Sequence, residues 1–181
     1  MVICAFDLAT ATGVCDGDIT AAPRLFTWWL SDAGASMGAR WHMLHDTLDR
    51  YFAKEPCDGV VYELPLNIAI MSGIGAQEAT VQFLRGAIGV LVERCHANNK
   101  KVEGLDVQDA RQSILGWRTN NEKKSGVKTK ARVMRDVKLH GVLFENDNEA
   151  DAAVLWLYAC ARCNPQKALQ LTPLFGGPLR V

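Results

Sequence analysis

Three acidic residues stand where a protein could use them for metal-dependent chemistry. Asp7 ends the apolar run of residues 2–6, Glu63 ends a second apolar run, and Asp151 lies in the first turn of an apolar segment near the C-terminus. A buried carboxylate is unfavourable unless it is paired or binds a metal ion. Oxygen ligands favour Mg²⁺ or Mn²⁺, and two such ions would suit the attack of water on a phosphodiester. Taken singly, each acid could instead cap a helix or pair with an arginine.

The segment before Asp151 holds further candidate ligands. On a helix, Asn148 and Asp151 share a face and Asp147 lies one turn before Asp151. Glu149 points to the other side unless it lies outside the first turn. Asp147 or Asn148 could equally be the N-cap of this helix. The predicted acidic site therefore includes Asn148 and Glu149 as candidates beside Asp151.

Residues 111–138 form a strongly basic segment in a protein without net charge. They include nine Lys and Arg residues against two acids, Glu122 and Asp136. Contacts to DNA phosphates require such a segment, and the indole of Trp117 could stack on a base or a sugar. The alternative is a solvated helix face with a mobile loop. The predicted DNA contacts are Arg111, Trp117, Arg118, Lys123, Lys124, Lys128, Lys130 and Arg132.

Short apolar runs and helical periodicity indicate the elements that must position these residues. Strands are expected at residues 2–8, 13–19, 24–30, 59–64 and 102–105, and helices at 36–53, 74–97, 107–115, 128–139 and 148–162. The first three strands follow one another without a helix, so they should form an antiparallel meander. The order predicts an α/β fold, with a mixed sheet between helices. Residues 1–163 should form one domain, and the proline-containing residues 164–181 an irregular tail.

Composition limits the function classes. The chain has 181 residues, 49% of them apolar, and no net charge, which predicts one folded domain without a global attraction to nucleic acid. Two-lobed kinases and ATPases need a longer chain. No apolar run is long enough to span a bilayer and no secretory leader is visible, so a cytoplasmic protein with no membrane contact is expected. The six cysteines should be reduced, buried thiols.

Four ordered motifs carry a resemblance to a known family. Residues 2–13 (VICAFDLATATG), 60–65 (VVYELP), 111–116 (RQSILG) with Lys130 downstream, and 148–153 (NEADAA) resemble the motifs of RuvC-type Holliday junction resolvases, most closely the small phage-type members. The resemblance spans about residues 1–162. It implies a ribonuclease-H-like fold with a five-stranded sheet, a homodimer, dependence on Mg²⁺ with Mn²⁺ as a substitute, and paired nicks in four-way DNA junctions.

The resemblance also implies roles for individual residues. The acids of the family map onto Asp7, Glu63 and Asp151, and its two basic residues near the scissile phosphate map onto Arg111 and Lys130. Two positions depart from the family pattern. Leu8 and Ala9 replace the usual Pro-Gly, which leaves the first ligand in place, and Asn148 stands where the family often has aspartate. An asparagine carbonyl can bind a metal ion but adds no charge, so Glu149 or Asp147 substitutes for it, or the second ion binds more weakly.

Three other functions remain open from the residues alone. The segment of residues 7–13 also resembles the phosphate loop of actin-like ATPases, although no second such loop follows. A DNA-binding protein with structural acids would lack metal-dependent nicking. The pair Cys160 and Cys163 could be half of a zinc site, but the chain has no second pair of this kind. For the homodimer, the helix at residues 74–97 is the expected contributor, because its glycines and alanines permit close packing.

Overall fold

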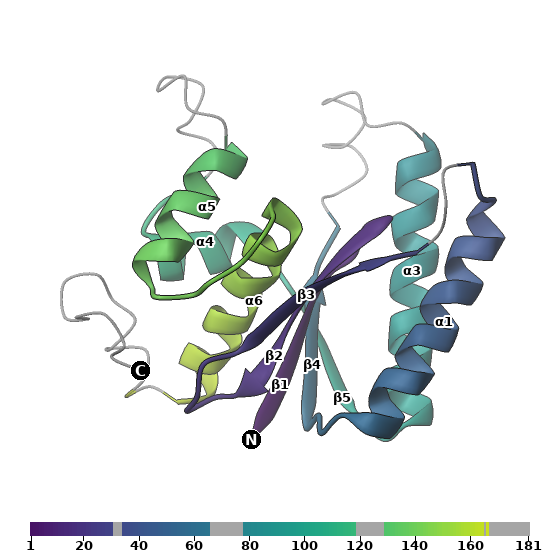
Figure 1. The fold of residues 1–181 in the computed structure, drawn as a ribbon, viewed down its shortest axis with the longest axis horizontal. Helices are drawn as coiled ribbons and strands as arrows, with labels where there is room; N and C mark the ends of the chain where they lie inside the picture. The colour runs from purple at the N-terminus through teal and green to yellow at the C-terminus, as the bar shows by residue number, and fades with distance from the viewer. Residues whose placement is uncertain (31–33, 66–77, 119–128, 165, 167–181) are drawn as a thin grey trace.

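The computed structural model describes residues 1–30, 34–65, 78–118, 129–164 and 166. It contains one five-stranded sheet with the strand order β3-β2-β1-β4-β5 (Figure 1). The strands are β1 (Val2–Asp7), β2 (Ala11–Asp18), β3 (Arg24–Trp29), β4 (Gly59–Glu63) and β5 (Lys101–Leu105). The first three pair antiparallel, and β4 and β5 extend the sheet in parallel from β1. The predicted mixed sheet with an antiparallel meander is confirmed.

Helices cover both faces of the sheet (Figure 1). On one side lie α1 (Met37–Lys54) and α3 (Glu78–Ala97), and on the other α4 (Val107–Leu115), α5 (Thr129–Leu139) and α6 (Asp147–Cys163). Alternate residues of β1 serve the two cores, as strand geometry requires. Ile3 and Ala5 pack in the α6 core, whereas Cys4 and Phe6 pack in the α1 and α3 core. This alternation fixes the face on which Asp7 lies.

The β1–β2 turn is tighter than the sequence pattern predicts. The strand β2 begins at Ala11, two residues before the expected start at Gly13. The Thr12 hydroxyl donates to the Ala9 carbonyl at 2.8 Å, which closes the connection and lets pairing begin early. The small residues before Gly13 are typical of a loop, so the local pattern does not predict a strand there. Their pairing with β3, in which Ala11 lies opposite Trp29, is a tertiary contact that the pattern does not show.

Side chains and one glycine define the helix ends next to the site. Asp106 caps α4, accepting from the backbone N–H of Gln108 at 2.7 Å, and Gly116 ends it with φ of 77°. Such a left-handed conformation favours glycine. Asn146 caps α6 and accepts from the Glu149 N–H at 3.0 Å. The expected caps, Asp147 or Asn148, are therefore wrong, since α6 begins one residue earlier than predicted.

Close packing of α1 on α3 depends on Gly86. A Cβ at this position would lie 2.2 Å from the Trp41 indole, whose N–H donates to the Phe83 carbonyl at 3.1 Å. One of the glycines expected to serve a dimer contact is thus used within the subunit. Residues 74–77, the start of the predicted helix, lie outside the described residues.

The cysteines are all free, and five of the six are buried. Only the exposed Cys163 departs from the prediction of buried thiols, because it lies in the last turn of α6. None of the helices in the described part of the chain has the length and apolarity needed to cross a membrane.

Candidate active site

Asp7 and Glu63 lie at the ends of adjacent parallel strands. Phe6 on β1 is in register with Tyr62 on β4, so the next residues, Asp7 and Glu63, end the strands at the same level. Strand alternation directs both carboxylates to the face covered by α6, because Ala5 and Val61 pack there. In Figure 1 these strand ends lie at the same end of the molecule as the first turns of α5 and α6.

Gly13 brings α6 to Asp7. It lies opposite Asp7 in the β1–β2 pair, and a Cβ at this position would stand 2.0 Å from the Asn148 carbonyl oxygen. Only a residue without a side chain allows the first turn of α6 to approach β2 so closely. Asp151 follows one turn later on α6. We call Asp7, Glu63 and Asp151 the acid site.

Arg111 on α4 supplies a positive charge to the acid site. Its Nη2 donates to Oδ1 of Asp151 at 3.0 Å, and the two side chains are only 12% and 14% exposed. Burial makes such a pair electrostatically stronger than one on the surface, although desolvation opposes it. Arg111, predicted near the scissile phosphate, therefore lies directly beside one of the predicted acids.

The surroundings of the acid site favour protonated carboxyl groups in the absence of a cation. Burial is the main cause that raises the pKa of Asp7 well above its ordinary value, and the charges of Glu63 and Asp151 raise it further. Burial followed by the charge of Asp151 raises the pKa of Glu63 to about 7. Arg111 opposes these shifts. A bound cation stabilises the ionised form of such close, desolvated carboxylates.

Asp151 is subject to the same opposing influences. Burial raises its pKa, while the charge and hydrogen bond of Arg111 and the charge of Lys130 lower it. Because burial outweighs the two cations, the pKa of Asp151 still lies above its ordinary value. The three acids therefore share one electrostatic environment.

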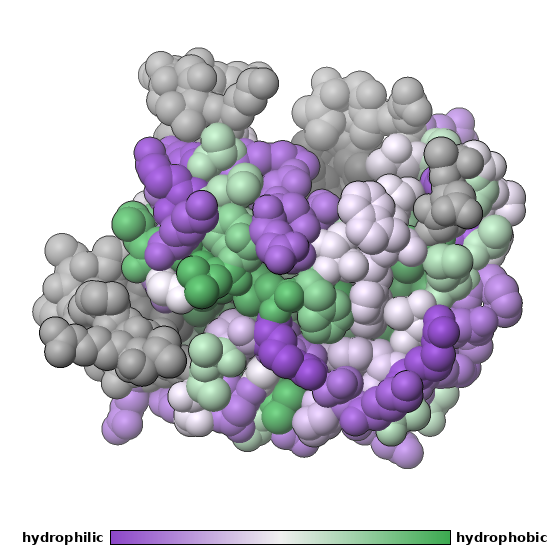
Figure 2. All heavy atoms as spheres, in the orientation of Figure 1, coloured by the Kyte–Doolittle hydropathy of each residue, from purple (hydrophilic) through white to green (hydrophobic). Residues whose placement is uncertain are grey.

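Lys130 and Asp147 form an ion pair at the rim of the acid site. Nζ of Lys130 donates to Oδ2 of Asp147, and the lysine side chain is 68% exposed. The charges of Asp151 and Asp7 also raise the pKa of Lys130, after its bond to Asp147. Lys130 is thus placed where a phosphate approaching the acids would meet it. Figure 2 shows hydrophilic residues gathered around the first turns of α5 and α6.

The structure takes Glu149 away from the acid site. Its side chain is 4% exposed and accepts hydrogen bonds from Thr27 at 3.0 Å, from Asn146 at 2.9 Å and from the Glu145 N–H at 2.8 Å. The carboxylate joins β3 to the start of α6, so its catalytic candidacy is replaced by a structural role. Asn148 is partly buried and its backbone packs on Gly13. The charge of Asp147, in the same turn, raises the pKa of Asp151.

Trp117 is a core residue, which contradicts the prediction that it stacks on DNA. Its side chain is 7% exposed, and its indole N–H donates to Asp136 at 2.8 Å. The guanidinium of Arg132 lies 4.1 Å from the ring centre and pairs with Asp136 at 3.7 Å. Arg132, a second predicted DNA contact, is therefore engaged in this packing. A buried indole whose N–H has a partner is a stable arrangement.

The other predicted DNA contacts lie on the surface or outside the described residues. Arg118 pairs with Asp109 and remains half-exposed, so it is accessible to a ligand. Lys123, Lys124 and Lys128 lie outside the described residues. The described part of the basic segment thus contributes Arg111 and Lys130 to the site, and Arg118 to the surface beside Asp109 on α4.

The acids provide the oxygen atoms that Mg²⁺ prefers as ligands, but they do not form a complete set of ligands around one point. Within the described ranges, no three His, Cys, Asp or Glu side chains are arranged to hold an ion. Cys160 and Cys163 are therefore not part of a group of three or more such side chains that could hold zinc. Mg²⁺ keeps several waters and commonly uses one or two carboxylates plus substrate phosphates. Asp7 and Glu63 supply two desolvated oxygen ligands on adjacent strands, so the residues present fit this hard cation.

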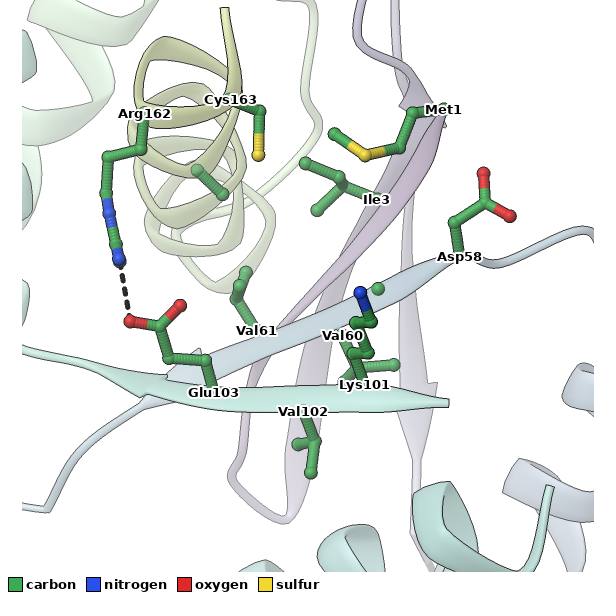
Figure 3. A pocket seen from close by; sticks show the side chains of 12 residues that line it. Met1, Ile3, Asp58, Val60, Val61, Lys101, Val102, Glu103, Arg162 and Cys163 are labelled. Carbon is green, nitrogen blue, oxygen red and sulfur yellow. Dashed lines mark hydrogen bonds and ion pairs between the residues drawn. The ribbon is translucent and has the colours of Figure 1, made fainter. Parts of the chain in front are cut away.

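A cavity lies at the opposite end of the sheet and is separate from the acid site. It has a volume of about 680 Å³ and is lined by the starts of β1, β4 and β5 and the end of α6. Figure 3 shows the ion pair between Arg162 and Glu103 at its side, with an Nη1 to Oε1 distance of 2.7 Å. The strands carry the acids at their other ends, so this cavity has no part in the chemistry of the acid site.

Comparisons with solved structures identify the fold. A structure of RuvC from Thermus thermophilus superimposes with a TM-score of 0.63 and 17% sequence identity, over 90% of this chain and 96% of that chain. A structure of T. thermophilus RuvC in complex with a Holliday junction substrate gives the same TM-score at 13% identity, over 90% and 95% of the two chains. The sequence matches no protein-family model and no curated protein. The predicted resemblance to RuvC is thus confirmed for the ribonuclease-H-like fold.

Proposed function

We propose that this protein is a metal-dependent endonuclease that cuts four-way or related branched DNA junctions. The observation that carries the proposal is the acid site itself. Three desolvated carboxylates from β1, β4 and α6 lie at one end of a RuvC-like sheet, with Arg111 and Lys130 beside them. The same fold binds a Holliday junction in the T. thermophilus RuvC complex.

Asp7 and Glu63 would hold Mg²⁺, and Asp151 would become a third oxygen ligand when a substrate phosphate draws Arg111 away from it. When bound, the ion would activate water and stabilise the charge that develops on the phosphate. Before DNA binds, Arg111 holds Asp151 in place through its hydrogen bond at 3.0 Å. Lys130, exposed at the rim, would attract the DNA backbone and neutralise part of its charge.

A DNA-binding protein without cleavage activity is the second candidate. The ion pair between Arg111 and Asp151 favours it, because a carboxylate already neutralised by an arginine is a poorer metal ligand. The same ion pair is compatible with an enzyme if the phosphate of the substrate draws Arg111 away from Asp151. Cleavage in the presence of metal distinguishes the two functions.

The test uses a synthetic four-way junction and a linear duplex of the same sequence, each with and without Mg²⁺. The enzyme should nick the junction only with Mg²⁺ and should leave the duplex largely intact. Asp7→Asn should abolish cleavage but keep junction binding, since removing a negative charge cannot weaken attraction for phosphate. Asp46→Asn, at a half-exposed position on α1, is the matched control and should cut normally.

Two results would contradict the proposal. Normal turnover by Asp7→Asn would remove this residue from the metal site. Tight junction binding by the wild-type protein without cleavage in Mg²⁺ or Mn²⁺ would favour the DNA-binding function instead.

A further inference from the structure

Trp29 is an exposed aromatic residue at the end of β3. Its side chain is 73% exposed, whereas tryptophan is highly buried on average. Single exposed apolar side chains are common on proteins, so exposure alone indicates little. The position of Trp29 relative to the acid site is what makes it informative.

The sheet register places Trp29 on the face that carries the acids. Thr27 donates to Glu149 on α6, and Trp29 follows two residues later on the same face. Thr27 lies opposite Gly13, which lies opposite Asp7. Two strand spacings of about 4.8 Å and two residues of about 3.4 Å separate Trp29 from Asp7, a distance of roughly 12 Å. Figure 1 shows the end of β3 near the end of β1.

The ring of Trp29 is left uncovered by its cross-strand partner. Ala11 lies opposite Trp29 in the β2–β3 pair, and its methyl group is too small to cover an indole. Leu30 continues the pairing, donating to the Thr10 carbonyl at 3.0 Å, so the backbone at Trp29 is held on both sides. The indole is therefore a flat apolar surface on an ordered backbone.

Neighbouring contacts hold this end of β3 firmly. Trp28, on the opposite face, lies 5.4 Å from Phe6 and 5.3 Å from Tyr51 between ring centres. On the acid-site face, Glu149 ties Thr27 to the first turn of α6. An aromatic platform of this kind loses little conformational entropy when a ligand stacks on it.

We propose that Trp29 stacks on an unpaired or splayed base of the branched DNA, a few nucleotides from the phosphate that meets the acid site. The inference rests on the proposed function. DNA suits the site because Arg111 and Lys130 attract its backbone, while a base at a branch point lacks a stacking neighbour on one side. Aromatic stacking tolerates any base, since every base has a π-face.

The test measures junction binding without divalent cations, so that no cleavage occurs. Junctions carry the fluorescent base 2-aminopurine at successive positions within four nucleotides of the branch point. Trp29→Ala should weaken junction binding by about 5- to 150-fold, the range expected for one stacked base, and should affect linear duplex binding less. Trp29→Phe should retain most of the affinity. Leu143→Ala, at an apolar residue that is 88% exposed elsewhere, is the matched control and should bind normally.

Fluorescence gives the second readout. Wild-type protein should quench 2-aminopurine at one or two positions, and Trp29→Ala should lose that quenching while Leu143→Ala keeps it. A Trp29→Ala protein with wild-type affinity and wild-type quenching would overturn the inference and leave the proposed function standing. If Trp29→Ala does not fold, Trp29→Phe and Trp29→Leu decide, and equal affinity for the two would overturn stacking. A wild-type protein that fails to bind any junction would overturn both proposals.

Discussion

Glu63 shows how one residue can report on the state of the acid site. Burial and the charge of Asp151 raise its pKa to about 7, so the folded protein binds a proton there more tightly than the unfolded chain does. Stability from this group is therefore fully present below the unfolded pKa and is lost as the pH rises to about 7. At pH 8 the metal-free protein holds an unfavourable buried charge at this position.

Glu63→Gln should therefore stabilise the metal-free protein at high pH. Relative to wild type, its free energy of unfolding should rise by on the order of 2 kcal/mol between pH 5 and pH 8, because the amide never ionises. Urea unfolding in EDTA at the two pH values measures the difference. Glu103→Gln, an exposed acid on β5, is the control and should show little change. If the difference in free energy of unfolding between Glu63→Gln and wild type were the same at both pH values, Glu63 would not be desolvated as described.

Mg²⁺ should reverse the loss of stability that the wild-type protein suffers when Glu63 ionises at high pH. A cation bound to the ionised acids favours the folded state, so its stabilisation should be larger at pH 8 than at pH 5 and should be lost in Glu63→Gln.

At the scale of elements, the approach of α6 to β2 determines whether the acids meet. Gly13 is the critical contact, since a Cβ there would overlap the Asn148 carbonyl. The hydrogen bonds of Glu149 with Thr27 and Asn146 hold the same turn from β3. The site therefore depends on residues that themselves perform no chemistry.

Gly13→Ala should move the first turn of α6 away from the sheet. We expect a loss of stability of about 1–3 kcal/mol from overpacking, and a loss of cleavage that exceeds what partial unfolding explains. Thermal unfolding and junction cleavage well below the melting temperature measure the two effects. Gly59→Ala on β4 is the matched control, because a Cβ there meets nothing within 4 Å. Full activity in a stable Gly13→Ala protein would show that the packing of α6 at Gly13 does not position Asp151.

The elements differ in how well the sequence predicts them. Asp7 and Glu63 could be placed because each ends a strongly apolar strand, and parallel strands bring their ends together. The role of Trp117 could not be predicted, because Asp136, the partner of its indole, lies 19 residues further along the chain on α5. Glu149 was misplaced for the same reason, since its partner Thr27 is 122 residues distant. Local periodicity locates elements, whereas tertiary partners decide which polar side chains are structural.

At the scale of the whole molecule, a junction with two-fold symmetry requires two active sites, and the described part of this chain holds one acid site. We expect a homodimer in solution. The surface of α3 around Gly89 and Val92 is the predicted interface: Gly89 has open space around it and Val92 is 37% exposed. Sedimentation at micromolar concentration should give twice the mass of the 19.9 kDa chain.

Val92→Glu should shift the protein toward monomer by placing a charge in that interface. Met43→Glu, at a similarly exposed apolar position on α1, should not. A wild-type protein that sediments as a monomer at these concentrations would contradict the dimer, and a Val92→Glu protein that remains dimeric would place the interface elsewhere.

Cleavage of a supercoiled plasmid that extrudes a cruciform tests the central claim most directly, because it reports junction selectivity, metal dependence and paired incision together. The wild-type protein should convert this plasmid to linear DNA in Mg²⁺, should leave it intact in EDTA, and should leave a plasmid without the inverted repeat supercoiled. Equal cutting of the two plasmids, or no cutting of either in Mg²⁺ or Mn²⁺, would contradict the assignment of the acid site as a junction-cleaving centre.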